Sequence, residues 1–493
     1  MKHKVFLPVI LLIGIVLLAS CAIGPASQAA TGSLSFLFPM GSLSREAGDE
    51  TYLVRVFYGL DLYDQEPKIV GNEIEYSGLP LGEVWIFIAR GIVGSDGYFY
   101  PTASGDIEKT IVGGENDSVT VTLTESPFEW SEDLKESNVV GLVELEGTVY
   151  AATDENELYK GTYSNDVFTT SSGPLVPDGI DVNSLSVGKV YDGADYIDQV
   201  WVNGSWSRTT GGGIMAWEAG GTLDTNFSEG FATKKNRKNG VVSDVDVLHS
   251  GAFVKPVNNG AAIFFQRDGG LGGVYLRSDP NEFAEPKDDW AWIVDEINFG
   301  ELLEDVVEDT DDLILDLEVS STTAYLVSSL ITVKISDSIL TATAVSVEDL
   351  MDTDIVAYAP EVGAPITDLD LDDTNDQIYI GTTNGLYVGK TSTAAGDFLL
   401  DGTDATVVSG TAGFSIEKVV SSQAGSYVAF ITKRGDDPDL LSFIKVSGST
   451  VKTYRTLQGL PGEDIQSLVW LDDGVLTIGG DRGLVAVDVS GEF

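Results

Sequence analysis

A pair of short strands joined by a tight turn recurs seven times between Thr148 and Phe493. Each copy is rich in β-branched and aromatic residues and is bounded by Gly, Asp or Asn, which is typical of strands and their turns. The copies recur at intervals of roughly 50 to 60 residues. They align on Tyr150, Trp201, Phe264, Tyr325, Tyr379, Ala429 and Leu476. A unit this small cannot cover its own apolar faces, so the copies must pack on one another.

Most of the seven pairs have a further alternating strand before and after them, which gives four strands per repeat. In the fifth copy, for example, "ITDLDLD" precedes "QIYIGTTNGLYVGK" and "ATVVSGT" follows it. Four strands at this period predict a β-propeller, in which each sheet is one blade and the blades pack around an axis. We expect seven blades within residues 126–493. The copies that start at Gln377 and Gly474 resemble the "IYIGTxxGL" repeats of two-component-regulator-type, WD40-like sensor propellers.

The last repeat predicts how the ring closes. The seventh unit ends at Phe493 after only three strands, and "SPFEWSE" (126–132) stands just before the first unit. We predict that Phe128–Trp130 supplies the missing outer strand of the seventh blade. This would pair the open edge of that blade, which could otherwise bind other strands. The alternative is that 126–132 is only a linker.

Residues 34–125 have a different pattern, with six or seven short alternating strands separated by Gly, Pro and Asp turns. This pattern predicts a small β-sandwich in front of the propeller. The segment "GLPLGEVWIF" (78–87) resembles the turn and strand of transthyretin-like and carboxypeptidase-regulatory-like domains. The whole chain is therefore expected to be all-β.

The first residues predict export and a lipid anchor. Lys2 and Lys4 precede an apolar run from Val5 to Leu18, which is too short for a confident membrane-spanning helix and fits a secretory signal. Leu18-Ala19-Ser20-Cys21 resembles the lipobox of bacterial lipoproteins. That resemblance implies a signal peptide (1–20), a lipid on Cys21, a tether (21–33) and a place in the bacterial cell envelope. By the same resemblance, Ala22, in place of Asp after the cysteine, implies the outer membrane. The alternative is an ordinary cleaved signal with an incidental cysteine.

Composition limits the possible partners and chemistry. The chain has 77 acidic and 28 basic residues, a net charge of −49, which argues against nucleic acid and anionic lipid surfaces. Cys21 is the only cysteine, so no internal disulfide can form. His249 is the only histidine outside the signal, which excludes sites with several His or Cys ligands. His249 is expected to be a polar residue at a strand end.

Two insertions interrupt the repeats. In residues 288–312, apolar side chains at Ile297, Leu302, Leu303, Val306 and Val307 follow a roughly helical spacing, so we expect a short amphipathic helix there or a plain loop. Residues 347–354 are expected to form another helical turn.

Three groups of residues are candidate binding sites. Asp368, Asp370 and Asp372 open a run that resembles the start of a calcium loop, although Asp373 replaces the glycine that such a loop needs. The same Asp/Leu alternation fits a strand followed by a turn. Trp201, Trp206 and Trp217 could stack on a sugar at the propeller mouth, or pack between blades. The basic cluster 234–238 could bind an acidic partner or lipid head groups, or form a solvated loop.

The sequence favours a lipid-anchored, non-enzymatic binding or scaffold protein whose propeller is an interaction platform. Its expected contacts are the membrane, through the lipid on Cys21, and a protein or glycan of unknown identity. We expect a monomer with no cofactor other than weakly bound calcium. Two alternatives stay open: a glycan-active hydrolase with two carboxylates in the central channel, and a scaffold for outer-membrane assembly.

Overall fold

The structure is a computed structural model. It describes residues 31–37, 50–58, 61–63, 67–70, 73–95, 97–117, 119–155, 157–164, 167–171, 180–191, 196–206, 212–218, 236–238, 241–243, 253–257, 261–265, 271–277, 290–298, 314–319, 324–328, 332–335, 355–358, 364–372, 374–375, 377–390, 406–434, 437–447, 451–454, 458–472 and 474–493. For residues 203–358 the description covers strand backbone and pairing. No helix among the described residues is long and apolar enough to cross a bilayer.

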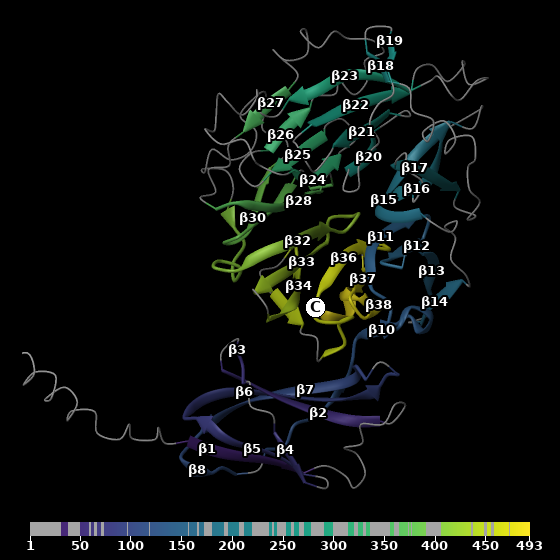
Figure 1. Ribbon diagram of the computed structural model, residues 1–493. Coiled ribbons are helices and arrows are strands. Elements are labelled where there is room, and N and C mark those ends of the chain that lie inside the picture. Colours follow the sequence, from purple (N-terminus) through teal and green to yellow (C-terminus); the bar gives the residue numbers. More distant parts are fainter. Residues whose placement is uncertain are drawn as a thin grey trace, which may run out of the picture. The chain divides into compact units, whose positions relative to one another are not determined.

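The chain divides into two compact units, Met1–Ser126 and Pro127–Phe493. The first unit contains two sheets, with strand orders β4-β5-β1-β8 and β3-β2-β6-β7-β9 (Figure 1). Its strands are β1 (Thr31–Leu37), β2 (Glu50–Tyr58), β3 (Asp61–Leu62), β4 (Lys68–Val70), β5 (Glu73–Pro80), β6 (Gly82–Val93), β7 (Phe99–Ile111), β8 (Gly114–Glu115) and β9 (Thr124–Glu125).

Alternating burial shows that the two sheets of the first unit pack face to face. In β1, Leu34 and Phe36 are buried while their neighbours Ser33 and Ser35 are half-buried. The buried residues of both sheets form one core, which consists of Leu34, Phe36, Val54, Val56, Ile74, Tyr76, Leu79, Val84, Ile86, Ile88 and Ile111. This arrangement confirms the predicted β-sandwich.

In the second unit, seven of the described sheets are blades that follow one another along the chain (Figure 1). Blade 1 is β11 (Val139–Leu145), β12 (Thr148–Thr153), β13 (Leu158–Ser164) and β14 (Val167–Ser171); blade 2 is β15 (Ile180–Tyr191), β16 (Tyr196–Trp206) and β17 (Gly212–Glu218); blade 3 is β20 (Phe253–Val257), β21 (Ala261–Phe265), β22 (Leu271–Arg277) and β23 (Trp290–Asn298); blade 4 is β24 (Ile314–Val319), β25 (Ala324–Ser328), β26 (Thr332–Ile335) and β27 (Ile355–Tyr358).

Blade 5 is β28 (Ile366–Asp372), β29 (Gln377–Thr382), β30 (Gly385–Lys390) and β31 (Thr406–Val407); blade 6 is β32 (Ser415–Ser421), β33 (Tyr427–Arg434), β34 (Asp437–Lys445) and β35 (Val451–Tyr454); blade 7 is β36 (Ile465–Trp470), β37 (Val475–Gly480), β38 (Gly483–Asp488) and β10 (Phe128–Trp130). A separate hairpin, β18 (Asn236–Lys238) and β19 (Val241–Ser243), follows blade 2. Short 3-10 helices cover Glu132–Leu134 and Val489–Glu492.

The first strands of the blades form a closed ring. Each contacts the first strand of the next blade, in the order β11, β15, β20, β24, β28, β32, β36, and β36 contacts β11. The structure is therefore a seven-bladed β-propeller, as the repeats predict. Neighbouring strands run antiparallel, so the loops joining second to third strands lie at the same end of the ring as the links between blades. We call this end the BC end, and the opposite end the AB end.

The strand pairing of blade 7 confirms the predicted closure. Strand β10 pairs antiparallel with β38, with Phe128 opposite Val487 and Trp130 opposite Val485. Phe128 is buried, and its ring meets that of Tyr454 in blade 6 edge-on, with centroids 5.2 Å apart. The strand before blade 1 therefore completes blade 7, and 126–132 is more than a linker.

The strand bounds confirm the repeat alignment and correct one insertion. All seven aligned residues, from Tyr150 to Leu476, lie in the second strands of their blades. Residues 290–298, where the sequence suggested part of a helix, form β23, which pairs with β22 as the fourth strand of blade 3. Trp290, Trp292 and Val294 alternate there in a β pattern that outweighs the helical spacing. Residues 299–313 and 347–354 lie outside the described residues.

A β-bulge recurs in the first strands. Six of them show a register shift one residue after a β-branched residue near the strand start: Val139, Val182, Ile314, Ile366, Ile416 and Ile465. In each case one extra residue is inserted, for example Thr367 in blade 5 and Glu417 in blade 6. A bulge bends a strand and redirects the side chains that follow it. The bulges therefore set which side chains of each first strand reach the neighbouring blade.

Candidate functional site

Asp368 and Asp370 join blade 5 to blade 6. The first strand of a blade pairs on one side only, so its other edge has unpaired N–H groups that need partners. Asp368 Oδ2 accepts a hydrogen bond from the Val419 N–H at 2.6 Å, and Asp370 Oδ2 accepts one from the Ser421 N–H, also at 2.6 Å. Thr367 Oγ1 donates to the Ile416 carbonyl oxygen of the same strand. Side chains of β28 thus satisfy the free edge of β32.

Asp372 has a different role from the other two aspartates. Its Oδ1 accepts from the Asn375 N–H at 3.0 Å and its Oδ2 from the Asn375 amide at 2.7 Å, which closes the turn between β28 and β29. The Asn375 amide also donates to the Gly425 carbonyl oxygen of blade 6. The three predicted calcium ligands thus have separate protein partners, in a strand followed by a turn. In the described part of the chain, no three His, Cys, Asp or Glu side chains are grouped to hold a metal ion.

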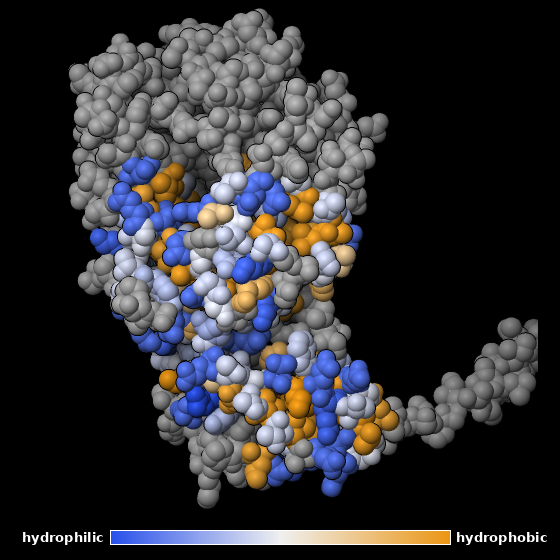
Figure 2. Space-filling model, turned by 180° about the vertical axis from the view of Figure 1, so that it is seen from behind, coloured by the Kyte–Doolittle hydropathy of each residue, from blue (hydrophilic) through white to orange (hydrophobic). Residues whose placement is uncertain are grey.

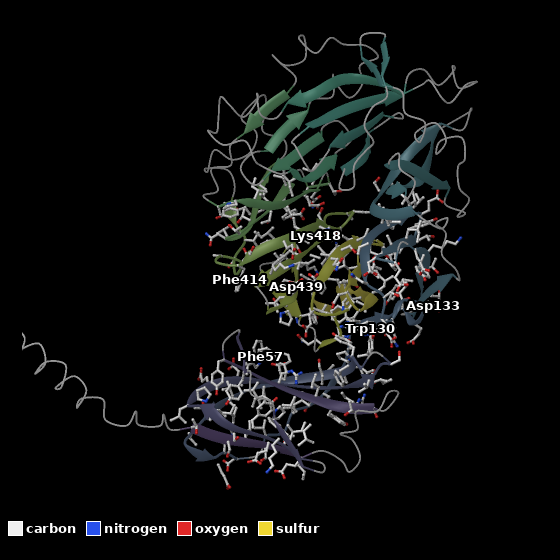
Figure 3. All side chains as sticks on the ribbon, viewed as in Figure 1. Phe57, Trp130, Asp133, Phe414, Lys418 and Asp439 are labelled. Carbon is white, nitrogen blue, oxygen red and sulfur yellow. The ribbon has the colours of Figure 1, made fainter. Side chains whose placement is uncertain are left out.

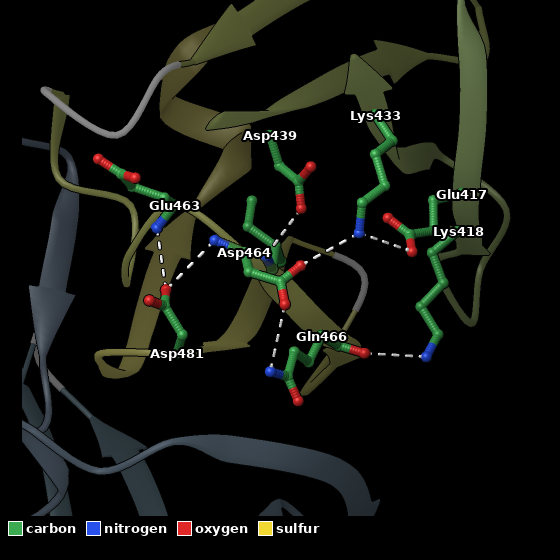
Figure 4. A network of polar contacts seen from close by, with 9 residues as sticks. Glu417, Lys418, Lys433, Asp439, Glu463, Asp464, Gln466 and Asp481 are labelled. Carbon is green, nitrogen blue, oxygen red and sulfur yellow. Dashed lines mark hydrogen bonds and ion pairs between the residues drawn. The ribbon is translucent and has the colours of Figure 1, made fainter. Parts of the chain in front are cut away.

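A network of charged side chains lies at the BC end between blades 6 and 7 (Figures 3 and 4). Lys433 Nζ lies 3.1 Å from Glu417 Oε1 and 3.3 Å from Asp464 Oδ1, so one cation bridges two carboxylates. Lys418 Nζ donates to the Gln466 carbonyl oxygen at 3.0 Å. Glu417 is the bulge residue of β32, which directs it toward this end of the ring.

Asp439 is the buried member of this network. Only 2% of its surface is exposed, and its Oδ2 accepts from the Ile465 N–H at 2.9 Å, at the start of blade 7. Its own N–H donates to the Glu463 carbonyl oxygen at 2.9 Å. Burial raises the pKa of Asp439 to about 6, against the opposing effects of the Ile465 hydrogen bond and the Lys433 charge. Asp439 therefore links two blades and is able to change its charge near neutral pH.

Lys433 responds to the same surroundings. Partial burial lowers its pKa, but the hydrogen bond and charge of Glu417, together with Asp439 and Asp464, outweigh this and raise the pKa overall. Lys433 therefore stays a cation, and its single charge offsets part of the negative charge of two carboxylates of the network.

Blade 1 adds further carboxylates at the BC end. Asp133 and Glu155 are exposed, and together with Glu157 they lie close enough to Tyr159 to affect its ionisation. Burial, the Glu157 hydrogen bond and these negative charges raise the pKa of Tyr159 to about 12. Lys135, a cation of the same loop, pairs with Glu132. At the BC end of blades 6, 7 and 1, Lys433, Lys135 and Arg482 lie against carboxylates and Lys418 against the Gln466 carbonyl oxygen. Acidic side chains outnumber these cations, so this surface is acidic.

The sequence alone did not identify Asp439 or Lys433. Asp439 stands in "RGDDPDLL", where two other aspartates and a proline make it look like one more turn residue. Its partner Ile465 belongs to the next repeat, so only the packing of blades brings the two together. The one available signal was the aspartate directly before the apolar pair Leu440 and Leu441, within a segment that reads as a strand.

The predicted tryptophan site is only partly described. Trp201 and Trp206 lie on β16 and Trp217 on the neighbouring β17, where Trp217 pairs with Val200. Their side chains are outside the described part of the structure, so the sugar-stacking role stays a prediction. Cys21, His249, Lys234 and Lys235 also lie outside the described residues.

No model of a known protein family and no curated protein matches this chain. Among solved structures, it is similar to YCF48 from Cyanidioschyzon merolae, with a TM-score of 0.47 and 10% identity over 74% of this chain and 99% of that one. YCF48 bound to D1 peptide gives a TM-score of 0.44 and 9% identity, over 73% and 94%.

The chain is also similar to the extracellular domain of the hybrid two-component system BT4673 from B. thetaiotaomicron. Here the TM-score is 0.43 and the identity 10%, over 73% of this chain and 39% of that one. The strand pairing of the chain itself shows the seven-bladed ring.

Proposed function

We propose that this chain is a lipid-anchored protein of the bacterial cell envelope, and that its propeller binds a partner protein at the BC end without chemical turnover. The observation that supports the binding site is the acidic surface contributed by blades 6, 7 and 1. Lys433, Lys135 and Arg482 are already paired with carboxylates on that surface, and Lys418 is bonded to the Gln466 carbonyl oxygen. A ligand that supplies its own positive charge would complement this surface.

Glycan hydrolysis is the alternative role for the carboxyl groups of the propeller. An acid–base pair needs two carboxyl groups with separated pKa values near one another. Burial raises the pKa of the Asp439 carboxyl group, but its Oδ2 already accepts a hydrogen bond from the Ile465 N–H. We therefore favour binding over hydrolysis as the role of the propeller.

Binding should be tested with the purified mature chain against basic peptides, envelope proteins and neutral oligosaccharides. We expect basic segments to bind, and their affinity to fall as salt is raised. Asp133→Lys should weaken binding several-fold. Glu146→Lys makes the same charge change in the exposed turn between β11 and β12, at the AB end, and should leave affinity unchanged.

Two outcomes would overturn this proposal. One is binding of neutral oligosaccharides with no binding of basic segments. The other is hydrolysis of any oligosaccharide that is lost on substitution of one carboxylate. The lipid anchor is tested separately, by the intact mass of the mature N-terminal peptide: we expect acyl groups on Cys21, and a bare thiol there would refute the anchor.

A further inference from the structure

Two exposed apolar side chains lie at one end of the N-terminal sandwich. Leu81 is 47% exposed and Val112 is 55% exposed. Leu81 precedes Gly82 and Val112 follows Ile111, and Gly82 pairs with Ile111 in the β6–β7 ladder, so the two residues are neighbours at the end of that ladder. Figure 2 shows that hydrophobic residues lie among hydrophilic ones on the face of this unit that it presents.

This end is also where the chain enters the sandwich. Thr31, the first residue of β1, pairs with Pro80, directly before Leu81. Gly32 lies so close to the β7–β8 link that a Cβ there would come within 2.5 Å of the Val112 carbonyl oxygen. The segment before Thr31 therefore begins beside both exposed side chains.

Val112 is held in place although its side chain is exposed. The Asn116 amide nitrogen donates to the Ser33 and Val112 carbonyl oxygens, at 3.0 and 3.1 Å, and Asn116 Oδ1 accepts from the Val112 N–H at 2.9 Å. The loop that presents Val112 is thus fixed to β1. An apolar side chain held outward by a rigid loop needs little further ordering to bind a surface.

Tyrosine side chains border the same end. Tyr58 Oη donates to the Pro80 carbonyl oxygen at 2.9 Å, and the Tyr58 ring meets that of Tyr63 edge-on, with centroids 5.9 Å apart. Both tyrosines are half-buried. Tyrosine is enriched where proteins meet the head-group region of a bilayer, because its ring is apolar and its hydroxyl is polar.

The chain leaves the sandwich elsewhere. The Ser126 N–H donates to the Thr102 carbonyl oxygen at 2.9 Å, near the start of β7. Thr102 lies nine residues from Ile111 along β7, which is about 30 Å. Ile92, which is 42% exposed, lies at that far end, where it pairs with Tyr100. Entry and exit of the chain are thus at opposite ends of the unit.

We propose that the end of the sandwich formed by Thr31, Pro80, Leu81 and Val112 rests on the lipid surface, with Leu81 and Val112 in the head-group region. This inference depends on the proposed lipid at Cys21. The ten residues from Cys21 to Thr31 span at most about 35 Å, so the anchor keeps this end close to the bilayer. Exposed Glu83 and Glu115 flank the two apolar residues, which favours a zwitterionic lipid surface over an anionic one.

The test places an environment-sensitive fluorophore on the acylated full chain through Leu81→Cys, Val112→Cys or, as the matched control, Ile92→Cys. The proteins are reconstituted in phosphatidylcholine vesicles that contain spin-labelled lipid. We expect at least threefold stronger quenching at positions 81 and 112 than at 92, and slower amide hydrogen exchange at both sites in the unlabelled chain. Adding phosphatidylglycerol should weaken the quenching.

Equal quenching at all three positions on vesicle-bound protein would overturn the proposal, and stronger quenching with phosphatidylglycerol would overturn its lipid preference. A second arm replaces the acyl anchor with an N-terminal His tag on nickel-chelating lipid. If native protein carries no acyl group but the tagged chain shows the expected quenching, the anchor at Cys21 fails while the lipid-facing surface stands. If acylated protein binds vesicles without differential quenching, the anchor stands and the surface fails.

Discussion

The sequence around Asp368 and Asp370 is compatible with two interpretations, a calcium site and a strand. An Asp-x-Asp spacing puts both carboxylates on one side of a strand, which suits a cation equally well as a row of N–H groups. In this propeller the row of donors is present, because the edge of β32 faces β28. The Asp/Leu alternation predicts a strand. The sequence does not reveal which groups its aspartates bind, because Val419 and Ser421 lie one repeat further along the chain.

At this scale we predict that Asp370→Ala lowers the free energy of unfolding by about 1–3 kcal/mol, since the Ser421 N–H and hydroxyl lose their acceptor. Asp370→Asn keeps an acceptor oxygen and should lose less. Urea unfolding of each variant, with calcium and with EDTA, measures the effect. The calcium hypothesis gains support if only the wild-type protein is stabilised by calcium.

Asp439 predicts a pH dependence. Its folded pKa of about 6 is above the usual aspartate value of 3.8, so the folded state binds the proton more tightly than the unfolded state. Its contribution to stability is therefore present at low pH and is lost as pH rises through about 6.

Asp439→Asn is expected to flatten the dependence of the melting temperature on pH between 4 and 7, and to be no less stable than wild type at pH 8. Asp439→Ala should be destabilised at every pH, because the Ile465 N–H loses its acceptor. Melting curves across this range provide the measurement. An unchanged pH profile in Asp439→Asn would show that another group is responsible.

At the scale of elements, the bulged first strands and the closing strand β10 decide how the blades fit together. The position of β10 could be predicted, because a three-stranded last repeat and a spare strand before the first are both visible in the sequence. The bulges were not predicted, although the extra residue shifts the apolar alternation by one position, as between buried Ile366 and Leu369. The segment 290–298 was misjudged for a related reason: short apolar runs fit both periods until a partner strand is known.

We predict that Phe128→Ala destabilises the propeller by about 3–5 kcal/mol, since the ring is buried against Tyr454. Glu129→Ala, in the same strand but exposed, should change stability by less than about 0.5 kcal/mol. Urea unfolding followed by tryptophan fluorescence compares the two. Equal effects would mean that the strand acts through its backbone alone.

At the scale of the whole molecule, the two units have separate cores, and the boundary at Ser126–Pro127 falls just before the closing strand. A chain that starts at Pro127 retains β10, and we expect it to be folded and monomeric. A chain that starts at Glu132 lacks β10 and leaves the edge of β38 unpaired, so it should self-associate.

Light scattering and circular dichroism of the two shortened chains distinguish these outcomes. Self-association of the chain that starts at Pro127 would mean that the sandwich, rather than β10, keeps the propeller soluble.

The pairing of β10 with β38 also determines when the ring can close during synthesis and folding. Strand β10 leaves the ribosome before every blade but is the last to be paired, because its partner β38 is made after blades 1 to 6. Pairing β10 with β38 closes a loop that contains almost the whole propeller, and closing a loop of this length is slow. For the export proposed above, this order has a consequence: the ring cannot close until strand β38 has crossed the membrane.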